Sequence, residues 1–233
     1  MNSASFFVLG VLPYLAVVVF AAGMINRFYT WFKTPQPGKM TLFPAGGSAT
    51  GGVLAETFFF PSLFRGDRVL WFFAWVFHAT LALVFLGHIR VFTGLIDRVL
   101  MSIGVSPEGI DAMSSTLGGA AGVVLLATGL LLLFRRIVQQ RTREISNFSD
   151  FFALLLLIAI IFTGDLMRFG THFELAETRA WARSLVTFSP IVVNNGMFQV
   201  HALLAMVLII YVPFSKIMHF GGIFFTQALI KRR

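Results

Sequence analysis

Five long apolar runs alternate with polar segments along the chain. A helix needs about 20 consecutive, mostly apolar residues to cross a bilayer. The runs predict transmembrane helices at residues 6–24, 69–92, 117–134, 151–167 and 197–212, the last continuing to about residue 217. The expected fold is therefore all-α, an integral membrane bundle of five transmembrane helices in which residues 1–233 form a single domain.

The composition agrees with a chain that lipid covers. Hydrophobic residues make up 57% of the sequence and charged residues only 12%, whereas soluble domains contain about 25% charged residues. The chain has no cysteine, so it forms no disulfide and cannot bind a cysteine-ligated iron–sulfur cluster of its own. Any electron transfer through it requires a different cofactor.

The net charge of +8 indicates membrane topology and not nucleic-acid binding, because the basic residues flank the apolar runs. Basic residues concentrate in cytoplasmic loops. With five spans, three basic segments fall on one side: the first loop (Arg27, Lys33, Lys39, Arg65, Arg68), the third loop (Arg135, Arg136, Arg141, Arg143) and the C-terminus (Lys231, Arg232, Arg233). This distribution predicts an N-terminus outside and a C-terminus in the cytoplasm.

Two connections are too apolar for free linkers. Residues 30–68 contain four prolines and a Gly-rich run, and we expect them on the membrane surface or on a partner. Residues 168–195 are partly amphipathic, and Trp181, Leu185 and Phe188 are expected at the outer interface.

Four of the five histidines fall in or beside two apolar runs. His78 and His88 belong to the second, and His201 and His219 to the fifth. Ionisable residues at membrane depth are costly and need partners, and histidine is a common axial ligand of haem iron. Because the two helices run in opposite directions, depth pairs His78 with His219 on the inner side, and His88 with His201 on the outer side. We therefore predict two b-type haems; four unrelated packing histidines are the alternative.

The spacing of the histidines leaves a question open. His78 and His88 are 10 residues apart, roughly 15 Å along a helix, whereas His201 and His219 are 18 residues apart, roughly 27 Å. Either the haems tilt or the fifth helix bends, for which Pro213 lies in the right place. Small residues nearby, Gly87, Gly196 and the run 118–122, either make room for porphyrin or serve ordinary helix packing.

Polar residues at the outer helix ends predict a quinone pocket; they are His88, Arg90, Asp97, Asp111, Asp165, Arg168 and His172. Asp165 is a candidate acceptor of a quinol proton. An ion pair between Asp165 and Arg168, three residues on, is the favoured alternative. For His172, a surface role is favoured over a role as proton acceptor.

Several motifs together carry a resemblance. They are His78 and His88 at their spacing, the run 118–122, residues 131–136 ending in Arg135 and Arg136, residues 181–188, and His201 through Pro213 to His219. The chain resembles the gamma subunit of respiratory nitrate reductase and its relatives over nearly its whole length. These relatives include cytochrome b subunits of membrane complexes in sulfate-reducing and sulfur-oxidising prokaryotes, whose partner is an iron–sulfur protein similar to heterodisulfide reductase.

The resemblance implies two b haems held by the same histidine pairs, and an inner-side contact of Arg135 and Arg136 with a haem propionate or a partner. It further implies a prokaryotic cytoplasmic membrane, a quinone or menaquinone substrate, a cytoplasmic iron–sulfur partner and further membrane and periplasmic subunits. Ile110 and Asp111 stand near where nitrate reductase has a quinol-site lysine, which favours the sulfur-metabolism relatives. The expected function is electron transfer between the quinone pool and the iron–sulfur partner, with terminal catalysis in partner subunits. A non-redox anchor or small transporter is the alternative.

Overall fold

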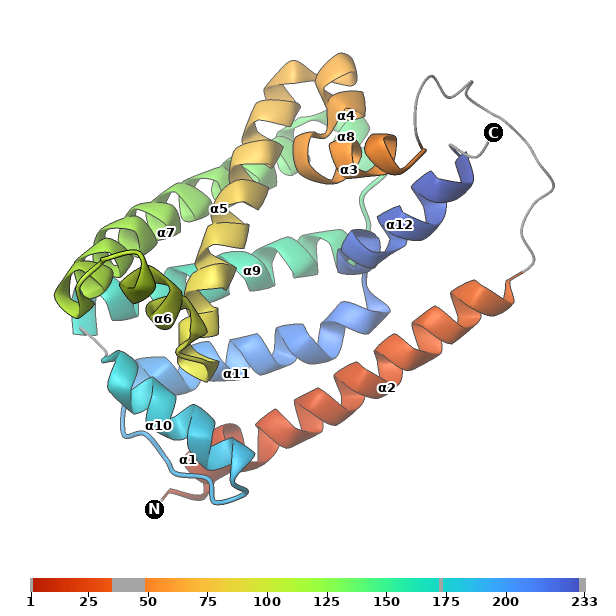
Figure 1. Cartoon of the computed structure of the whole chain (residues 1–233). Helices are drawn as coiled ribbons and strands as arrows, with labels where there is room; N and C mark the ends of the chain where they lie inside the picture. The colour runs from red at the N-terminus through yellow and green to blue at the C-terminus, as the bar shows by residue number, and fades with distance from the viewer. Residues whose placement is uncertain (1, 35–48, 172–173, 231–233) are drawn as a thin grey trace.

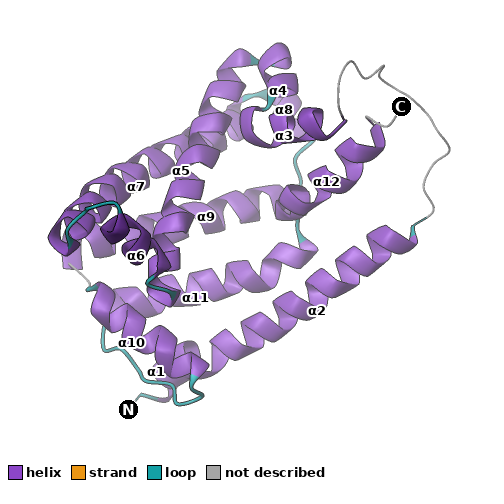
Figure 2. Ribbon diagram, viewed as in Figure 1, coloured by secondary structure: helices purple, strands orange, loops and turns teal. Residues whose placement is uncertain are grey.

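The computed structural model describes residues 2–34, 49–171 and 174–230, and all regular structure in them is helical (Figure 2). Five helical segments of this part are long and apolar enough to cross a membrane: Ser3–Lys33, Arg68–Phe92, Pro107–Val138, Phe148–Gly170 and Gly196–Phe214. The predicted all-α fold and its five spans are therefore confirmed. The first, third and fourth spans extend beyond the apolar runs, because polar and basic residues continue the helices past the hydrocarbon region.

The first span consists of α1 (Ser3–Phe6), a π-helical turn (Phe7–Val11) and α2 (Leu12–Lys33). The others are α5 (Arg68–Phe92), α7 (Pro107–Val138), α9 (Phe148–Leu166) with a π-helical turn (Met167–Thr171), and α11 (Gly196–Tyr211). The short helices are α3 (Ala49–Phe59), α4 (Pro61–Gly66), α6 (Leu95–Ser102), α8 (Gln140–Glu144), α10 (Leu175–Val186) and α12 (His219–Ile230).

Polar side chains just before the spans define where several helices begin. Asp67 accepts a hydrogen bond from the Leu70 backbone N–H at 2.8 Å, and Ser106 and Asn195 cap α7 and α11 in the same way. Asn147 forms a reciprocal capping box with Asp150 at the start of α9. Such caps satisfy backbone donors that the first turn leaves free. The sequence itself therefore specifies these helix starts.

The spans pack in the order α2, α11, α9, α7, α5. Figure 1 shows the short helices at two ends of the bundle, with α3, α4, α8 and α12 at one and α1, α6 and α10 at the other. We name these the inner end and the outer end, because the first end carries the basic loops that predict the cytoplasmic side. The orientation in the membrane stays a prediction of that charge distribution.

Residues 30–68 contain more helix than a polar loop would. α2 continues to Lys33, and α3 and α4 fill the second half of the segment. The indole N–H groups of Trp71 and Trp75 on α5 donate to the carbonyls of Phe59 and Phe58 at 2.7 and 3.0 Å. These bonds dock α3 against α5 at the inner end. Residues 35–48, with Lys39 and the Gly-rich run at 45–48, lie outside the described residues.

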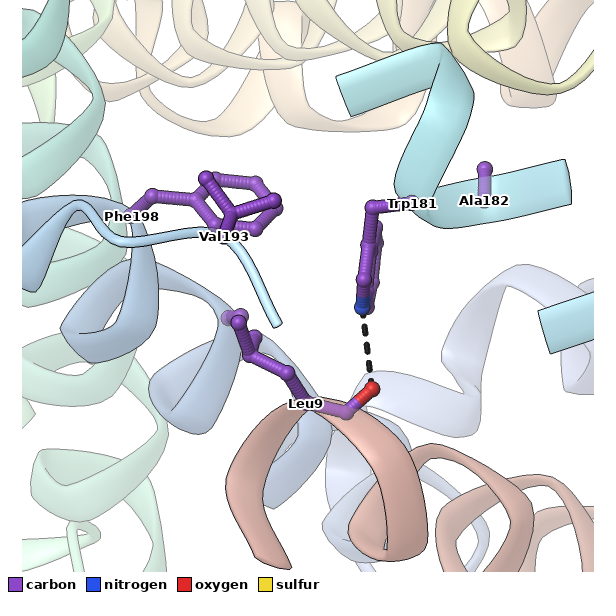
Figure 3. Packing of buried hydrophobic residues seen from close by; sticks show 6 residues of the cluster. Leu9, Trp181, Ala182, Val193 and Phe198 are labelled. Carbon is purple, nitrogen blue, oxygen red and sulfur yellow. Dashed lines mark hydrogen bonds between the residues drawn. The ribbon is translucent and has the colours of Figure 1, made fainter. Parts of the chain in front are cut away.

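At the outer end, Trp181 attaches α10 to the bundle through packing and one hydrogen bond. Its indole packs with Val193 and Phe198, and its N–H donates to the Leu9 carbonyl at 2.9 Å (Figure 3). Trp181 is only 6% exposed, so its side chain packs inside the protein, and its level at the outer membrane interface stays a prediction. Phe188, by contrast, is 81% exposed. The Leu9 carbonyl lies in the π-helical turn, where the altered backbone pairing lets it serve a tertiary contact.

The fifth span does not continue as one helix to residue 217. α11 ends at Tyr211, two 3₁₀ turns flank an extended Ser215, and α12 begins at His219. Pro213, which has no N–H to donate, lies at the break. α2 braces this point, since Arg27 Nε donates to the Pro213 carbonyl at 3.1 Å. A Cβ on Gly23 would lie 2.6 Å from Pro213 Cβ, so the close approach requires glycine.

Candidate functional site

The four membrane histidines meet in the two predicted pairs. The ring centres of His78 and His219 are 5.9 Å apart, and those of His88 and His201 are 6.3 Å apart. α5 and α11 have little backbone contact with each other, so side chains span the space between them. His78 lies nearer the inner end of α5 than His88 does, and His88 follows ten residues further toward the outer end.

Every one of these imidazoles is held through Nδ1. His78 Nδ1 lies 2.7 Å from the Ala74 carbonyl, and His88 Nδ1 lies 2.8 Å from that of Val84. His219 Nδ1 lies 3.0 Å from the Lys216 carbonyl. His201 Nδ1 lies 2.9 Å from Thr163 Oγ1 on α9. A carbonyl only accepts, so it places the proton on Nδ1 and leaves Nε2 with a free lone pair.

This arrangement fits a haem between the rings of each pair. Two imidazoles on one metal, each bonded at about 2 Å through Nε2, have ring centres roughly 6 Å apart. Both pairs have this separation. Within the described residues, Nε2 of none of the four histidines makes a hydrogen bond, and metal-bound histidine usually donates its other N–H, as Nδ1 does here. The residues present therefore suit two axial ligand pairs.

The helix break explains how unequal spacings give matched pairs. An unbroken helix would carry His219 roughly 27 Å from His201, well past the level of His78. The 3₁₀ turns and the extended Ser215 redirect the chain, and His219 then meets His78. Of the two possibilities that the sequence left open, the structure contains the bent fifth span.

The small residues serve two different purposes. Cβ atoms on Gly119 and Gly122 would meet Phe169 and Asp165, so these glycines allow α7 and α9 to pack closely. Gly87, Gly118 and Gly196 face open space, where a Cβ would meet nothing within 4 Å. Gly164 lies against the His201 ring, with a Cβ position 3.4 Å from Cε1. Much of the run 118–122 is therefore ordinary helix packing.

Arg135 and Arg136 lie at the inner end of α7 and bind residues of this chain. Arg135 pairs with Asp67 at 3.0 Å, and Arg136 donates to Ser146 Oγ at 2.7 Å. The Leu70 backbone N–H and the Arg135 guanidinium keep the pKa of Asp67 below its ordinary value. A contact of these arginines with a propionate or a partner stays a prediction.

An open cavity of about 800 Å³ occupies the outer end beside His88. Its lining includes Gly87, Arg90, Asp111, Arg168, Arg179 and Arg183. Three of the residues expected at the quinone pocket, Arg90, Asp111 and Arg168, thus share one cavity at the predicted place. Arg90 and Asp111 also form an ion pair at 3.0 Å.

Arg90 is the centre of a charge network around this cavity. It binds Asp97 at 2.6 Å, and Arg179 binds the same carboxylate at 2.6 Å. Burial by itself raises the pKa of Asp97, but hydrogen bonds from Arg90 and Arg179 outweigh it and hold the pKa below its ordinary value. Arg179 also donates to the Arg90 carbonyl at 2.8 Å. The network joins α5, α6, α7 and α10.

Asp165 and Arg168 do not form the ion pair favoured from the sequence. In the described part of the chain, Asp165 Oδ2 and Arg168 Nη2 are buried and have no hydrogen-bond partner. Asp165 instead points at α7, where only glycine at position 122 leaves room for its carboxylate. The physical reason is that the α7–α9 contact, invisible in the sequence, turns Asp165 away from Arg168. His172 lies outside the described residues.

Sequence reasoning missed Thr163 and Arg179. Thr163 is polar in an apolar run, immediately before Gly164 and Asp165, which was the available signal. Arg179 gives no such signal in the sequence, because its contacts with Arg90 and Asp97 depend on the docking of α10.

The fold and the two histidine pairs define a multi-pass membrane protein of the cytochrome b-like class. A sequence model of the family described as "Nitrate reductase gamma subunit" matches residues 62–231, and the chain belongs to this family.

Among its relatives is the "Hdr-like menaquinol oxidoreductase cytochrome b-like subunit" of Archaeoglobus fulgidus, 34% identical over 93% of this chain and 76% of the relative. The "Respiratory nitrate reductase 2 gamma chain" of Escherichia coli is 29% identical over 62% of this chain and 67% of the relative. The "Nitrate reductase gamma chain" of Bacillus subtilis is 26% identical over 90% and 88%. These archaeal and bacterial relatives confirm the resemblance, and they confirm a multi-pass prokaryotic membrane protein.

Proposed function

We propose that this protein is the dihaem cytochrome b subunit of a respiratory complex, with residues 1–233 as one membrane domain. In this role it carries electrons between the quinone pool and a cytoplasmic iron–sulfur subunit, and terminal catalysis lies in partner subunits. The observation that carries the proposal is the two histidine pairs, each with free Nε2 atoms and ring centres about 6 Å apart.

His78 and His219 would hold the inner haem, and His88 and His201 the outer haem. When bound, the two haems supply one-electron redox chemistry at two levels of the membrane. The chain's own contribution is to fix those levels, since the positions of His78 and His88 on one helix separate them by roughly 15 Å. The Nδ1 hydrogen bonds orient each imidazole and raise its basicity toward iron.

The outer cavity is the proposed quinol site. It adjoins His88 through Gly87, and it offers Arg90 and Asp111 to the oxygens of a quinol. Asp165, which precedes the cavity-lining Arg168 by three residues and has an unpartnered oxygen, is the proposed proton acceptor. Oxidation of a quinol to a quinone there would release two electrons, one to each haem that the histidine pairs would hold, and two protons toward the outer side. The A. fulgidus relative is named for a menaquinol oxidoreductase, so menaquinol is the proposed quinol.

The inner end is the proposed docking face for the iron–sulfur partner. Arg65, Arg68, Arg141 and Arg143 are exposed there, while Arg135 and Arg136 hold the end together. Exposed cations favour a partner with an acidic docking face and speed its encounter. From the name of the same relative, we propose an iron–sulfur protein similar to heterodisulfide reductase, with further membrane and periplasmic subunits.

A haem b spectrum of the purified chain tests the proposal directly. We expect the absorption of reduced haem b, with two components in a redox titration. A protein with no haem after expression in a host that makes haem b would support the non-redox anchor or small transporter and refute the proposal.

A further inference from the structure

The four histidines differ in the group that forms a hydrogen bond with Nδ1 of the imidazole. For His78, His88 and His219 the acceptor is a backbone carbonyl of the same chain segment, three or four residues earlier. For His201 the partner at hydrogen-bond distance is a side chain on another helix, Thr163 Oγ1 of α9 at 2.9 Å, and the backbone of Ile160 in the same turn of α9 also interacts with this histidine. A backbone carbonyl survives any substitution, whereas a hydroxyl depends on the residue. The hydrogen bond to His201 Nδ1 therefore depends on which side chain occupies position 163, and a substitution there can change it.

The single proton of the Thr163 hydroxyl determines which atom donates in its hydrogen bond with His201 Nδ1. A threonine hydroxyl has one proton and two lone pairs. The Thr163 hydroxyl donates that proton to the carbonyls of Ala159 and Ile160, each at 2.9 Å. It therefore accepts from His201 Nδ1–H, which leaves Nε2 of His201 unprotonated. Thr163 is 8% exposed, so water does not replace it readily.

α9 also supports the ring sterically. A Cβ on Gly164 would lie 3.4 Å from Cε1 of His201, which is van der Waals contact. Thr163 and Gly164 thus both lie beside the imidazole. Neither residue belongs to the helix that carries His201.

We propose that Thr163 is the positioning residue of the outer haem ligand, which orients His201 and sets the redox potential of the outer haem separately from the inner one. The inference rests on the proposed function, because it concerns the haem that His88 and His201 would share. A hydrogen bond from Nδ1–H makes an imidazole a stronger electron donor to its metal. Stronger donation stabilises oxidised iron, so losing the bond raises the midpoint potential.

The test compares three variants of the full chain in purified form. Thr163→Val keeps the shape and removes the acceptor, and Thr163→Ser keeps the hydroxyl. Thr128→Val is the matched control: Thr128 on α7 is also buried, at 6% exposed, and also donates to the carbonyls three and four residues earlier, but within the described residues it makes no hydrogen bond to a histidine. Potentiometric titration gives both components, and the outer one is the component that His88→Ala lacks.

We expect Thr163→Val to change the oxidised-to-reduced ratio of the outer component about tenfold toward the reduced form, a rise of roughly 59 mV for one electron. The inner component, Thr163→Ser and Thr128→Val should keep wild-type potentials. If Thr163→Val loses the outer component while Thr128→Val keeps both, positioning is likewise supported. Unshifted potentials in Thr163→Val, equal shifts of both components, or equal effects in Thr128→Val would overturn the inference. A wild-type chain without two haem b components would instead refute the proposed function.

Discussion

At the scale of the residue, the ligand pairs are separate units. His78 and His219 meet at the inner end, and His88 and His201 meet ten residues further along α5. No described hydrogen bond joins one pair to the other. Each proposed haem then depends on its own two residues.

We therefore predict that His78→Ala or His219→Ala removes the inner haem and leaves the outer one. A redox titration of the purified variant should contain one haem b component where the wild type has two. His88→Ala and His201→Ala are the matched variants for the other component. Equal loss of both components in every single variant would contradict independent sites.

Asp165 is the residue whose proposed role depends most on the structure. Its unpartnered oxygen excludes the helix-end ion pair, and Gly122 leaves room for it beside α7. Asp165→Asn should keep both haems but slow their reduction by a quinol analogue about 100-fold, since an amide cannot accept the proton. Stopped-flow reduction across pH measures this. Reduction as fast as the wild type at every pH would exclude the proton-acceptor role.

At the scale of the element, the break in the fifth span depends on α2. The approach of Gly23 to Pro213 leaves no space for a side chain, and Arg27 binds the carbonyl of the same proline. The break in turn delivers His219 to His78. A distant helix thereby supports the inner ligand pair.

Gly23→Val should force α2 away from Pro213 and destabilise the protein by about 1–3 kcal/mol, because overpacking strains a close contact. The inner haem component should weaken before the outer one. Ala22→Val, at the exposed neighbouring position, is the control and should behave as the wild type. Thermal unfolding followed by haem absorbance distinguishes them, and an unchanged inner component in Gly23→Val would argue against the brace.

The charge network at the outer end allows a comparison of two carboxylates, on α6 and α7, that pair with the same arginine. Asp97 and Asp111 both pair with Arg90, but their side chains are 17% and 75% exposed. Removing the less exposed partner leaves Arg179 without a carboxylate and Arg90 with Asp111 alone, so Asp97→Asn should cost about 3 kcal/mol. Asp111→Asn should cost at most about 1 kcal/mol. Thermal unfolding in detergent measures both, and equal losses would refute the role of burial.

The same ion pairs give a pH dependence of known sign. The pKa of Asp97 is below its ordinary value in the folded protein. Its contribution to stability is therefore fully present above the unfolded pKa of about 4 and is lost as pH falls through the folded pKa. In the Asp97→Asn variant, the free energy of unfolding should therefore fall less than in the wild type as pH is lowered.

At the scale of the whole molecule, the bundle has two chemically different ends. The described basic residues of the first and third loops gather at the end with α3, α4, α8 and α12 (Figure 1). The outer end carries the charge network and the cavity. This polarity places the proposed quinol site and the proposed partner on opposite faces of the membrane.

The cysteine-free sequence makes the topology testable by labelling. A cysteine placed by Gln140→Cys on α8 should react with an impermeant maleimide only when the cytoplasmic face is accessible. Ser102→Cys on α6, at the other end, should react from outside in intact cells. Outside labelling of Gln140→Cys would reverse the topology.

The five spans and the pairing of the four histidines could be predicted from the amino-acid sequence alone. These follow from local properties, namely the length of an apolar run, the direction in which consecutive spans cross, and the cost of an ionisable group in lipid. Only the tertiary structure decided how the fifth span bends, which helix holds His201, and where Asp165 points. Each of these depends on contacts between distant segments: Gly23 with Pro213, Thr163 with His201, and Gly122 with Asp165. Helix packing in a membrane is governed by the fit of small and large side chains, and that fit exists only once the helices are assembled.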